Sequence, residues 1–307
     1  MKLLDTHLLE AGAPDSLRHL IDYIGRAAKY IHFHLQVGNL QAAGTTNASG
    51  ETQLELDVLA DKTIMENVMV CRLTSAAISE EQEEITVCPH CKKGDCGEYA
   101  VAFDPLDGSS LVDANLAIGT IVSIYPGHHF IGRTGREQVA ALYVVYGPRT
   151  TLVYTIGKGV HEFQLNDVGE FMLKQEGLTV RDEAKNFAPG NLRAAKDNPK
   201  YRALVEGWMN AEYTLRYSGG MVPDLNHIFT KGQGIFTYPP FPPKYPKGKL
   251  RLLFECNPFA FLMEQAGGQA SDGTQDILDV KIEDHHQRTP IYIGSGKEVE
   301  RVVETLR

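Results

Sequence analysis

The segment at residues 103–110, which reads FDPLDGSS, contains the residues best suited to chemistry. It ends the apolar run 99–103, so its aspartates come at the end of an expected strand. Asp104 and Asp107 stand three positions apart across a proline turn, and both carboxylates and the Leu106 carbonyl can point into one pocket. Hard divalent cations prefer such oxygen ligands, and Mg²⁺ keeps water positions that a phosphate oxygen can take. The spacing therefore predicts a cation site.

The glycine and two serines after the aspartates predict a phosphate-binding turn. The backbone N–H groups and hydroxyls of a Gly-Ser-Ser turn can surround an anion. One short segment would then hold a cation and also a phosphate, the latter through Gly108, Ser109 and Ser110. The competing interpretation is an ordinary Asp-Gly surface turn, because DPLDG alone is a short motif.

Further carboxylates follow two other apolar runs. Glu80 and Glu81 could serve a cation and a water, although the acidic run 80–84 also fits a solvated loop. Glu255 closes an apolar run, a place that a solvated loop explains less well. Upstream, Asp57 taken alone would be an ordinary residue of an amphipathic helix.

The composition indicates a soluble globular protein. The 307 residues are 43% hydrophobic and 22% charged, which are ordinary values. A net charge of −9 argues against a nucleic-acid partner, although bound cations with Lys and Arg can still make one pocket attractive to an anion. No apolar run reaches the roughly 20 residues needed to cross a bilayer, and the N-terminus lacks a secretory signal. We therefore expect a cytoplasmic or plastid protein without a membrane partner.

The five cysteines predict no disulfide scaffold, because their number is odd in a chain of this size, and they favour a reducing compartment. Cys88, Cys91 and Cys96 have a CxxC-x4-C spacing that hints at zinc or a redox pair. Even with His90 they lack the second ligand pair of a recognisable zinc finger. An inert insertion is therefore the competing interpretation.

Apolar periodicity and run length predict alternating helices and strands. Helices are expected at 16–37, 53–70, 199–211, 222–230 and 257–266, with a last helix from Lys297. Strands are expected at 75–79, 99–103, 118–125, 139–146, 151–156, 160–165, 233–238 and 249–255. This order predicts helices packed on sheets. A polar stretch near residue 187 predicts two subdomains, at 1–187 and 188–307.

The motifs together resemble a known superfamily. An upstream Asp, a Glu-Glu pair, DPLDGSS and a late carboxylate, in this order, resemble the lithium-sensitive phosphatases. Residues 249–258 (KLRLLFECNP), with Gly267 and Gly268 beyond, resemble the fructose-1,6-bisphosphatase/sedoheptulose-1,7-bisphosphatase family. The inositol monophosphatase branch closes with Trp-Asp, whereas the only tryptophan here, Trp208, precedes Met209. The resemblance implies an α/β sugar-phosphatase fold of alternating helix and sheet layers, an αβαβα sandwich.

Within the family, some stretches look like sedoheptulose-1,7-bisphosphatase. They are residues 139–142, 146–151, 189–194 and 213–224. Fructose-bisphosphatases usually have a Ser where Gly220 stands and a Tyr where Ala194 stands. An Ala beside Arg193 would make room for a longer sugar.

This resemblance implies hydrolysis of the 1-phosphate of sedoheptulose 1,7-bisphosphate to sedoheptulose 7-phosphate, a phosphoric monoester hydrolase reaction. The first alternative is a fructose-1,6-bisphosphatase or a dual-specificity enzyme. An inositol-phosphate or nucleotide 3′-phosphatase is disfavoured by the missing Trp-Asp. A more distant alternative is an inactive homologue that acts as a binding subunit. Carbon fixation and carbon-chain rearrangement would both need this chemistry.

By resemblance, the N-terminal subdomain is the catalytic, metal-binding one. Two or more Mg²⁺ ions, with Mn²⁺ as a substitute, would be held by Glu80, Asp104, the Leu106 carbonyl, Asp107 and Glu255. The group that orients and deprotonates the attacking water would be Glu81, supported by Asp57 and Glu51. Glu255 would make the C-terminal subdomain supply the last metal ligand.

The same resemblance implies where the substrate binds. The 1-phosphate would sit on Gly108, Ser109 and Ser110, and the sugar and distal phosphate on Asn191, Arg193, Arg216, Tyr217, Gly219, Gly220, Met221, Tyr238 and Lys249. In this family the arginine matching Arg216 reaches in from a neighbouring subunit, so we expect a homodimer or homotetramer. For each tyrosine alone, core packing with a satisfied hydroxyl is the competing interpretation.

Overall fold

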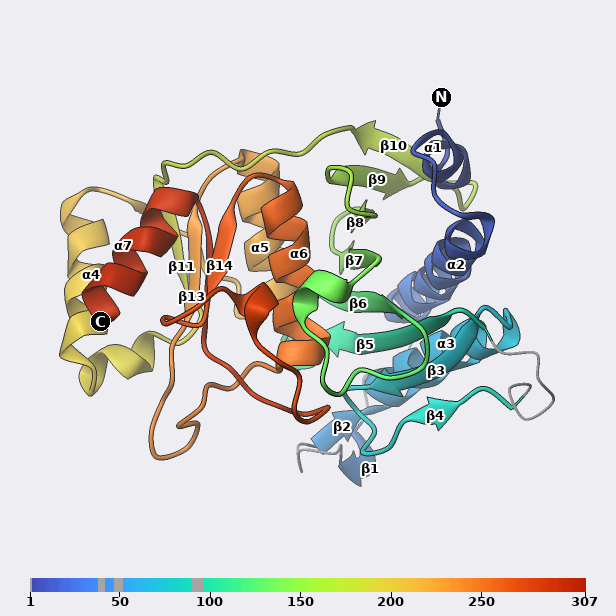
Figure 1. Ribbon diagram of the computed structural model, residues 1–307, viewed down its shortest axis with the longest axis horizontal. Coiled ribbons are helices and arrows are strands. Elements are labelled where there is room, and N and C mark those ends of the chain that lie inside the picture. The colour runs from blue at the N-terminus through green and yellow to red at the C-terminus, as the bar shows by residue number, and fades with distance from the viewer. Residues whose placement is uncertain (1, 38–41, 47–51, 90–96) are drawn as a thin grey trace.

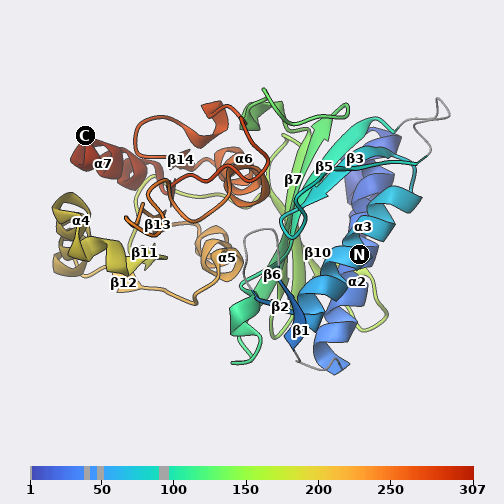
Figure 2. The same cartoon turned by 90° about the horizontal axis from the view of Figure 1, so that it is seen from below.

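The computed structural model describes residues 2–37, 42–46, 52–89 and 97–307, with the backbone only for 42–46 and 52–54. In these residues the chain forms five layers: helices, an eight-stranded sheet, helices, a five-stranded sheet and helices (Figure 2). This is the αβαβα sandwich that the sequence predicts. Both sheets are covered on both faces, so their strands carry apolar side chains toward each neighbouring layer.

The larger sheet brings the motif segments together. It contains β3 (Thr74–Ser79), β4 (Thr86–Val87), β5 (Tyr99–Asp107), β6 (Ile118–Pro126), β7 (Ala140–Tyr146), β8 (Thr150–Thr155), β9 (His161–Leu165) and β10 (Phe171–Gln175). The strand order is β10-β9-β8-β7-β6-β5-β3-β4, and only β3 and β5 are parallel neighbours. Because parallel strands end at the same edge of a sheet, Glu80 after β3 comes close to the aspartates of β5.

Three helices cover the outer face of this sheet, α1 (Leu4–Glu10), α2 (Asp15–Val37) and α3 (Glu55–Val70), as Figure 1 shows. The short pair β1 (Ala42–Thr46) and β2 (Thr52–Leu54) precedes α3. Helix α2 buries the stripe predicted from its spacing, including Leu17, Leu20, Ile24 and Ile31. Full burial of such a side chain stabilises the fold by roughly 1.5–3 kcal/mol. The stripe therefore accounts for the attachment of α2 to the sheet.

The smaller sheet and four helices complete the sandwich. Its strand order is β12 (Thr214–Leu215), β11 (Asn186–Pro189), β13 (Ile235–Tyr238), β15 (Ile291–Gly294) and β14 (Gln269–Ser271). Helices α5 (Met221–Lys231) and α6 (Asn257–Gln265) lie between the two sheets, and α4 (Pro199–Asn210) and α7 (Gly296–Leu306) form the outer layer. Helix α4 begins at Asn198, whose side chain accepts the N–H of Tyr201, with Pro199 in the first turn.

The predicted helices are all present, each within two residues of its expected bounds. The strand predicted at 249–255 is wrong. Arg251 forms one isolated bridge with Arg288, and the chain then enters a π-helix, Leu252–Cys256, that continues into α6. Periodicity could not separate the two cases, because a short, fully buried apolar run fits a strand or a helix equally well.

The two sheets share one hydrophobic core. That core contains Ile78 and Tyr143 of the larger sheet, Phe236 and Ile293 of the smaller sheet, and Phe259 of α6 between them. The division of the chain near residue 187 stays a prediction, because this shared core joins the two halves.

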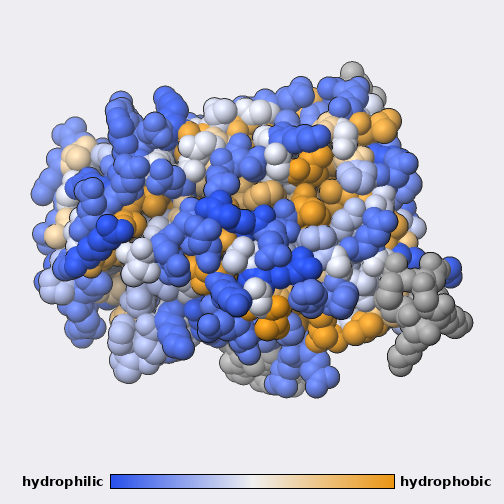
Figure 3. All heavy atoms as spheres, viewed as in Figure 1, coloured by the Kyte–Doolittle hydropathy of each residue, from blue (hydrophilic) through white to orange (hydrophobic). Residues whose placement is uncertain are grey.

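Among the described residues, every helix is too short or too polar to cross a bilayer. On the face shown in Figure 3, hydrophilic residues dominate and hydrophobic ones form small separate groups. The expected compartment stays a prediction.

Candidate active site

A cavity of about 530 Å³ lies where the ends of β3 and β5 face α5 and the π-helix. Most residues selected from the sequence line it. They are Asp57, Glu80, Glu81, Asp104, Leu106, Asp107, Gly108, Ser109, Ser110, Arg193, Tyr217, Gly219, Gly220, Met221, Tyr238, Lys249 and Glu255. Three charged residues that the sequence did not single out, Asp113, Asp224 and Arg251, also line the cavity.

The centre of the cavity is a group of buried carboxylates. Oxygens of Glu80, Asp104 and Glu255 lie within 4.8 Å of one another, and each residue is at most 9% exposed. All the donors are hard oxygens, which suit Mg²⁺ or Mn²⁺ rather than a thiolate-seeking metal. The described residues therefore fit a divalent cation at the place that the sequence predicts.

Burial and the repulsion of neighbouring carboxylates disfavour the ionised forms of Asp104 and Glu255. Burial first, and then the charges of Glu80, Asp107 and Glu255, raise the pKa of Asp104 well above its ordinary value. Burial and the charge of Glu80 raise the pKa of Glu255 to about 8, although Arg251 opposes the shift. Positive charge placed among these oxygens would favour the ionised forms, because an opposite charge nearby offsets the cost of desolvation.

Local structure holds each carboxylate in place. The N–H of Glu80 donates to the Phe103 carbonyl at 2.9 Å, which continues the β3–β5 pairing by one residue. Asp104 Oδ1 accepts the N–H of Leu106 at 3.0 Å, which closes the proline turn. The register of β5 against β6 shifts between Asp104 and Asp107. This irregularity re-aims the two aspartates into the cavity.

Asp107 also holds α5 in place. Its Oδ2 accepts the N–H of Val222 at 2.7 Å, and its Oδ1 accepts the N–H of Met221 at 3.4 Å. These are first-turn amides of α5, which lack partners inside the helix. The hydrogen bonds oppose burial, so the pKa of Asp107 rises only to about 6. Asp107 thus connects the turn that carries the two aspartates to the middle layer of helices.

Arg251 is the main residue that sequence reasoning missed. Its guanidinium donates to Glu80, and Nη1 lies 4.0 Å from Glu255 Oε2. Its own backbone N–H donates to Glu255 Oε2 at 2.6 Å. A buried cation among the carboxylates is the counter-charge they require. The signal was available, because Arg251 stands two positions after Lys249 in the same motif.

The turn predicted to bind phosphate lies at the edge of the cavity. Gly108 has φ +82°, a left-handed conformation that a side chain disfavours, and it precedes a 3₁₀ turn, η2 (Ser109–Leu111). Ser109 is half-buried, and Ser110 is exposed. The hydroxyls and the turn's amides lie beside the carboxylate group, as the predicted pairing of cation and phosphate requires.

The residues predicted to act on water also line the cavity. Asp57, in the first turn of α3, is 3% exposed, and Glu81 is half-buried with its N–H donated to Ser79 Oγ at 3.2 Å. Glu51 lies outside the described residues. The roles predicted for the three acids stay predictions.

The C-terminal half of the chain supplies part of the cavity wall. Around Tyr238, Arg193 and Lys249 supply positive charge and Tyr217 supplies a second hydroxyl. The Arg193 guanidinium lies 5.5 Å from the Phe241 ring centroid, a cation–π distance. An anion can therefore bind between two cations there.

Three selected residues do not line the cavity. Asn191 is 2% exposed, and its Oδ1 accepts the Arg193 N–H at 3.4 Å, so it positions Arg193. Arg216 is exposed and donates to the Leu215 carbonyl. Ala194 packs in the core of the outer layer with Trp208 and does not line the cavity, and the room predicted for a longer sugar stays a prediction.

Of the cysteines predicted to bind zinc or form a redox pair, Cys88 is buried with a free thiol. Cys91, Cys96 and His90 lie outside the described residues. That hypothesis stays a prediction.

Two family models together cover nearly the whole chain. The N-terminal domain of fructose-1-6-bisphosphatase matches residues 3–176, and its C-terminal domain matches residues 180–307. A class 1 fructose-1,6-bisphosphatase from Syntrophotalea carbinolica is 47% identical over 304 residues, which are 99% of this chain and 92% of the relative. The chloroplastic sedoheptulose-1,7-bisphosphatase of Spinacia oleracea is 42% identical over 305 residues, 99% of this chain and 77% of the relative.

A solved structure agrees over the full length. A Toxoplasma gondii protein named as a sedoheptulose-1,7-bisphosphatase superposes with a TM-score of 0.92 at 38% identity, covering 100% of this chain and 98% of the other. The chain therefore belongs to the fructose-1,6-bisphosphatase family of sugar bisphosphatases.

Proposed function

We propose that this family member hydrolyses the 1-phosphate of fructose 1,6-bisphosphate, with Mg²⁺ as cofactor, and also accepts sedoheptulose 1,7-bisphosphate. One observation carries the proposal. The buried carboxylates Glu80, Asp104 and Glu255 share one cavity with a Gly-Ser-Ser turn and with the cations Arg193 and Lys249. A bisphosphate with its two charged ends apart matches this arrangement.

The cation would be held by Glu80, Asp104, Asp107 and Glu255 with the Leu106 carbonyl. When bound, divalent ions would neutralise phosphate charge and make a bound water more acidic. Mn²⁺, which accepts the same ligands, would be a substitute.

The chain's own groups would bind and orient the reactants. Residues 108–110 would hold the 1-phosphate through amides and hydroxyls. Glu81, supported by Asp57, would orient the attacking water and take its proton. Such positioning supplies most of the catalysis in phosphoryl transfer, because little covalent chemistry is left to the protein.

The distal phosphate would bind Arg193, Tyr217, Tyr238 and Lys249, with Gly219, Gly220 and Met221 forming the wall beside the sugar. The exposed position of Arg216 supports a role in a neighbouring subunit's site, and hence a homo-oligomer. The oligomeric state stays a prediction.

Both sugars have support among the relatives. The bacterial relative is named for the six-carbon bisphosphate, and the spinach and Toxoplasma proteins for the seven-carbon one. The bacterial relative named for the six-carbon sugar is the more similar in sequence, at 47% identity against 42% for the spinach protein. We therefore place fructose 1,6-bisphosphate first.

The test is phosphate release from each bisphosphate, with and without Mg²⁺, by wild type and Asp104→Asn. We expect Mg²⁺-dependent release from both sugars, with the higher kcat/KM for fructose, and almost none from Asp104→Asn. A large preference for the seven-carbon sugar would contradict the ranking only. No release from either sugar would contradict the enzymatic function and favour an inactive homologue.

A further inference from the structure

A second group of metal-ligating side chains lies far from the active site, where α1, β9 and β10 come together (Figure 1). His7 of α1, His161 of β9 and Glu176 after β10 each offer a ligand atom, and these atoms lie within 4.8 Å of one another. They line a separate cavity of about 320 Å³ with Glu10 and Lys158. Four strand spacings, or roughly 19 Å at about 4.8 Å each, separate β9 from β5.

We propose that His7, His161 and Glu176 bind a divalent transition-metal ion, with Zn²⁺ as the best match. Zn²⁺ accepts two imidazoles and a carboxylate at about 2.0–2.2 Å, with a fourth position for water. Mg²⁺ prefers oxygen ligands alone, so the two sites differ in the class of ion that each selects.

The distances suit one tetrahedral ion. His7 Nε2 lies 3.2 Å from Glu176 Oε1. Two ligand atoms about 2.1 Å from a tetrahedral ion are about 3.4 Å apart, so this pair needs little rearrangement. The His161 ring faces the His7 ring with 4.4 Å between centroids, which brings the third ligand within reach.

The remaining ring nitrogens have the partners that metal-bound histidines usually have. His161 Nδ1 accepts the Gly177 N–H at 3.3 Å, so its proton is on Nε2, which lies 3.2 Å from the Lys158 carbonyl oxygen. His7 Nδ1 is hydrogen-bonded to the buried Tyr154 hydroxyl. Metal-bound histidines typically use the other nitrogen in this way. An ion at His161 Nδ1 would replace the long hydrogen bond from Gly177.

The neighbouring charges leave the site available. The nearby ammonium groups have partners of their own, since Lys2 Nζ lies 2.8 Å from Glu10 and Lys158 Nζ donates to the Ala11 carbonyl at 2.9 Å.

An ion here would fasten three separate segments. His7 belongs to the first helix, His161 to an inner strand near the sheet edge, and Glu176 begins the connection from β10 to β11 of the smaller sheet. Binding would therefore stabilise the packing of α1 on the larger sheet, close to the end of β10. The role is structural, and it does not depend on which sugar the active site accepts.

The test measures Zn²⁺ binding to the full chain by equilibrium dialysis, in excess Mg²⁺ to occupy the oxygen-rich active site. Every protein, wild type included, is measured with Cys91→Ser and Cys96→Ser, which remove the other candidate zinc ligands. We expect one Zn²⁺ to bind, with affinity at least about 100-fold lower in His161→Gln and in Glu176→Gln. His129→Gln is the matched control, because His129 is exposed beside His128, with 5.2 Å between ring centroids, and should bind Zn²⁺ like wild type.

A second measurement guards against misfolding. Glu176 is exposed, with 58% side-chain accessibility, so Glu176→Gln should fold normally. Zn²⁺ should raise the Tm of wild type and His129→Gln more than that of Glu176→Gln. Equal Zn²⁺ affinity in wild type, His161→Gln and Glu176→Gln would overturn the proposal, as would no detectable binding by wild type.

Discussion

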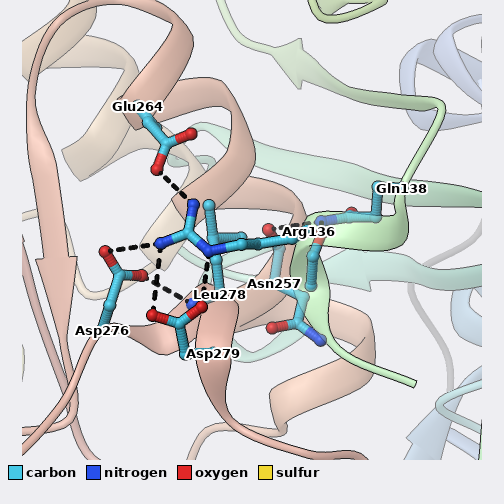
Figure 4. Close-up of polar contacts among 8 residues, drawn as sticks. Arg136, Gln138, Asn257, Glu264, Asp276, Leu278 and Asp279 are labelled. Carbon is cyan, nitrogen blue, oxygen red and sulfur yellow. Dashed lines mark hydrogen bonds and ion pairs between the residues drawn. The ribbon is translucent and has the colours of Figure 1, made fainter.

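Two arginines of this chain each face several carboxylates, Arg136 at the surface and Arg251 inside the active-site cavity. Figure 4 shows the surface cluster, in which Arg136 contacts Glu264, Asp276 and Asp279 at 2.9, 3.4 and 2.5 Å. The Arg136 side chain is 43% exposed, so water and salt screen these contacts. The cluster joins the 3₁₀ turn around Arg136 to α6 and to the turn η6 (Ile277–Asp279).

The cavity cluster also places one arginine among several carboxylates, but its side chains are buried. The Arg251 side chain is 5% exposed, and its partners Glu80 and Glu255 are 12% and 6% exposed. In the cavity, burial raises the pKa of Glu255, whereas at the surface Arg136 holds the pKa of Asp279 below its ordinary value. A carboxylate cluster therefore indicates a cation site only where desolvation leaves its charge uncompensated.

Arg251→Ala should have the largest effect. Removing one partner from a buried charge group costs about 3–5 kcal/mol of unfolding free energy, and we expect kcat/KM to fall by about 100-fold or more. Urea unfolding and steady-state kinetics measure the two effects. Arg251→Lys, which keeps the charge without the planar fork, should lie between. A fully active, stable Arg251→Ala would remove the distinction between the two clusters.

The effect of Mg²⁺ on thermal stability should be the next largest difference between the two clusters. At about 100 times its Kd, a ligand of the native state stabilises by about 2.7 kcal/mol. We expect Mg²⁺ to raise the Tm of Arg136→Ala as much as that of wild type and to have little effect on Glu255→Gln. A normal shift in Glu255→Gln would show that the ion binds elsewhere.

Arg136→Ala should have a smaller effect. Exposed ion pairs contribute about 0–1 kcal/mol each, so we expect a loss of about 1–2 kcal/mol and kcat/KM within about twofold of wild type. High salt should reduce the difference. Lys62→Ala, which removes a single exposed pair with Glu66 at 3.8 Å, is the matched control and should not change stability measurably. A hundredfold loss of activity in Arg136→Ala would break the comparison.

The dependence of stability on pH should have opposite signs at one aspartate of the cavity and one aspartate of the surface cluster. Burial raises the pKa of Asp224, beside the cavity, to about 6, so its contribution is present below its ordinary pKa of 3.8 and is lost as pH rises through 6. The pKa of Asp279 is lowered, so its contribution is present above 3.8 and is lost as pH falls. Urea titrations from pH 3 to 8 should show Asp224→Asn losing the first dependence and Asp279→Asn the second. The same slope in both variants would contradict this assignment.

The motif residues were predictable because each lies near a strand end that short-range patterns mark. Glu80, Asp104 and Asp107 follow this rule. Glu255 was placed in the cavity for the wrong structural reason, since a π-helix and not a strand presents it. Arg251 could have been suspected from its place beside Lys249, but its partner Glu80 could not, because that residue is 171 positions away in the sequence.

Contacts across such separations follow from topology, which local periodicity does not report. The same limit applies to the group formed by His7, His161 and Glu176. None of the three stands in a motif, and the edge of the sheet alone brings them together. Conversely, Ala194 belongs to a stretch that resembles a sugar site, yet its side chain packs into a core that the sequence does not reveal.

The position of α6 has a consequence for how the molecule melts. This helix begins at Asn257, two residues after Glu255, and packs on strands of both sheets. If either sheet lost its order, one face of α6 would become exposed to water. The two sheets should therefore unfold together, and calorimetry should record a single cooperative transition. An ion on Glu255 would then protect amides in both sheets against hydrogen exchange together, including those far from the site.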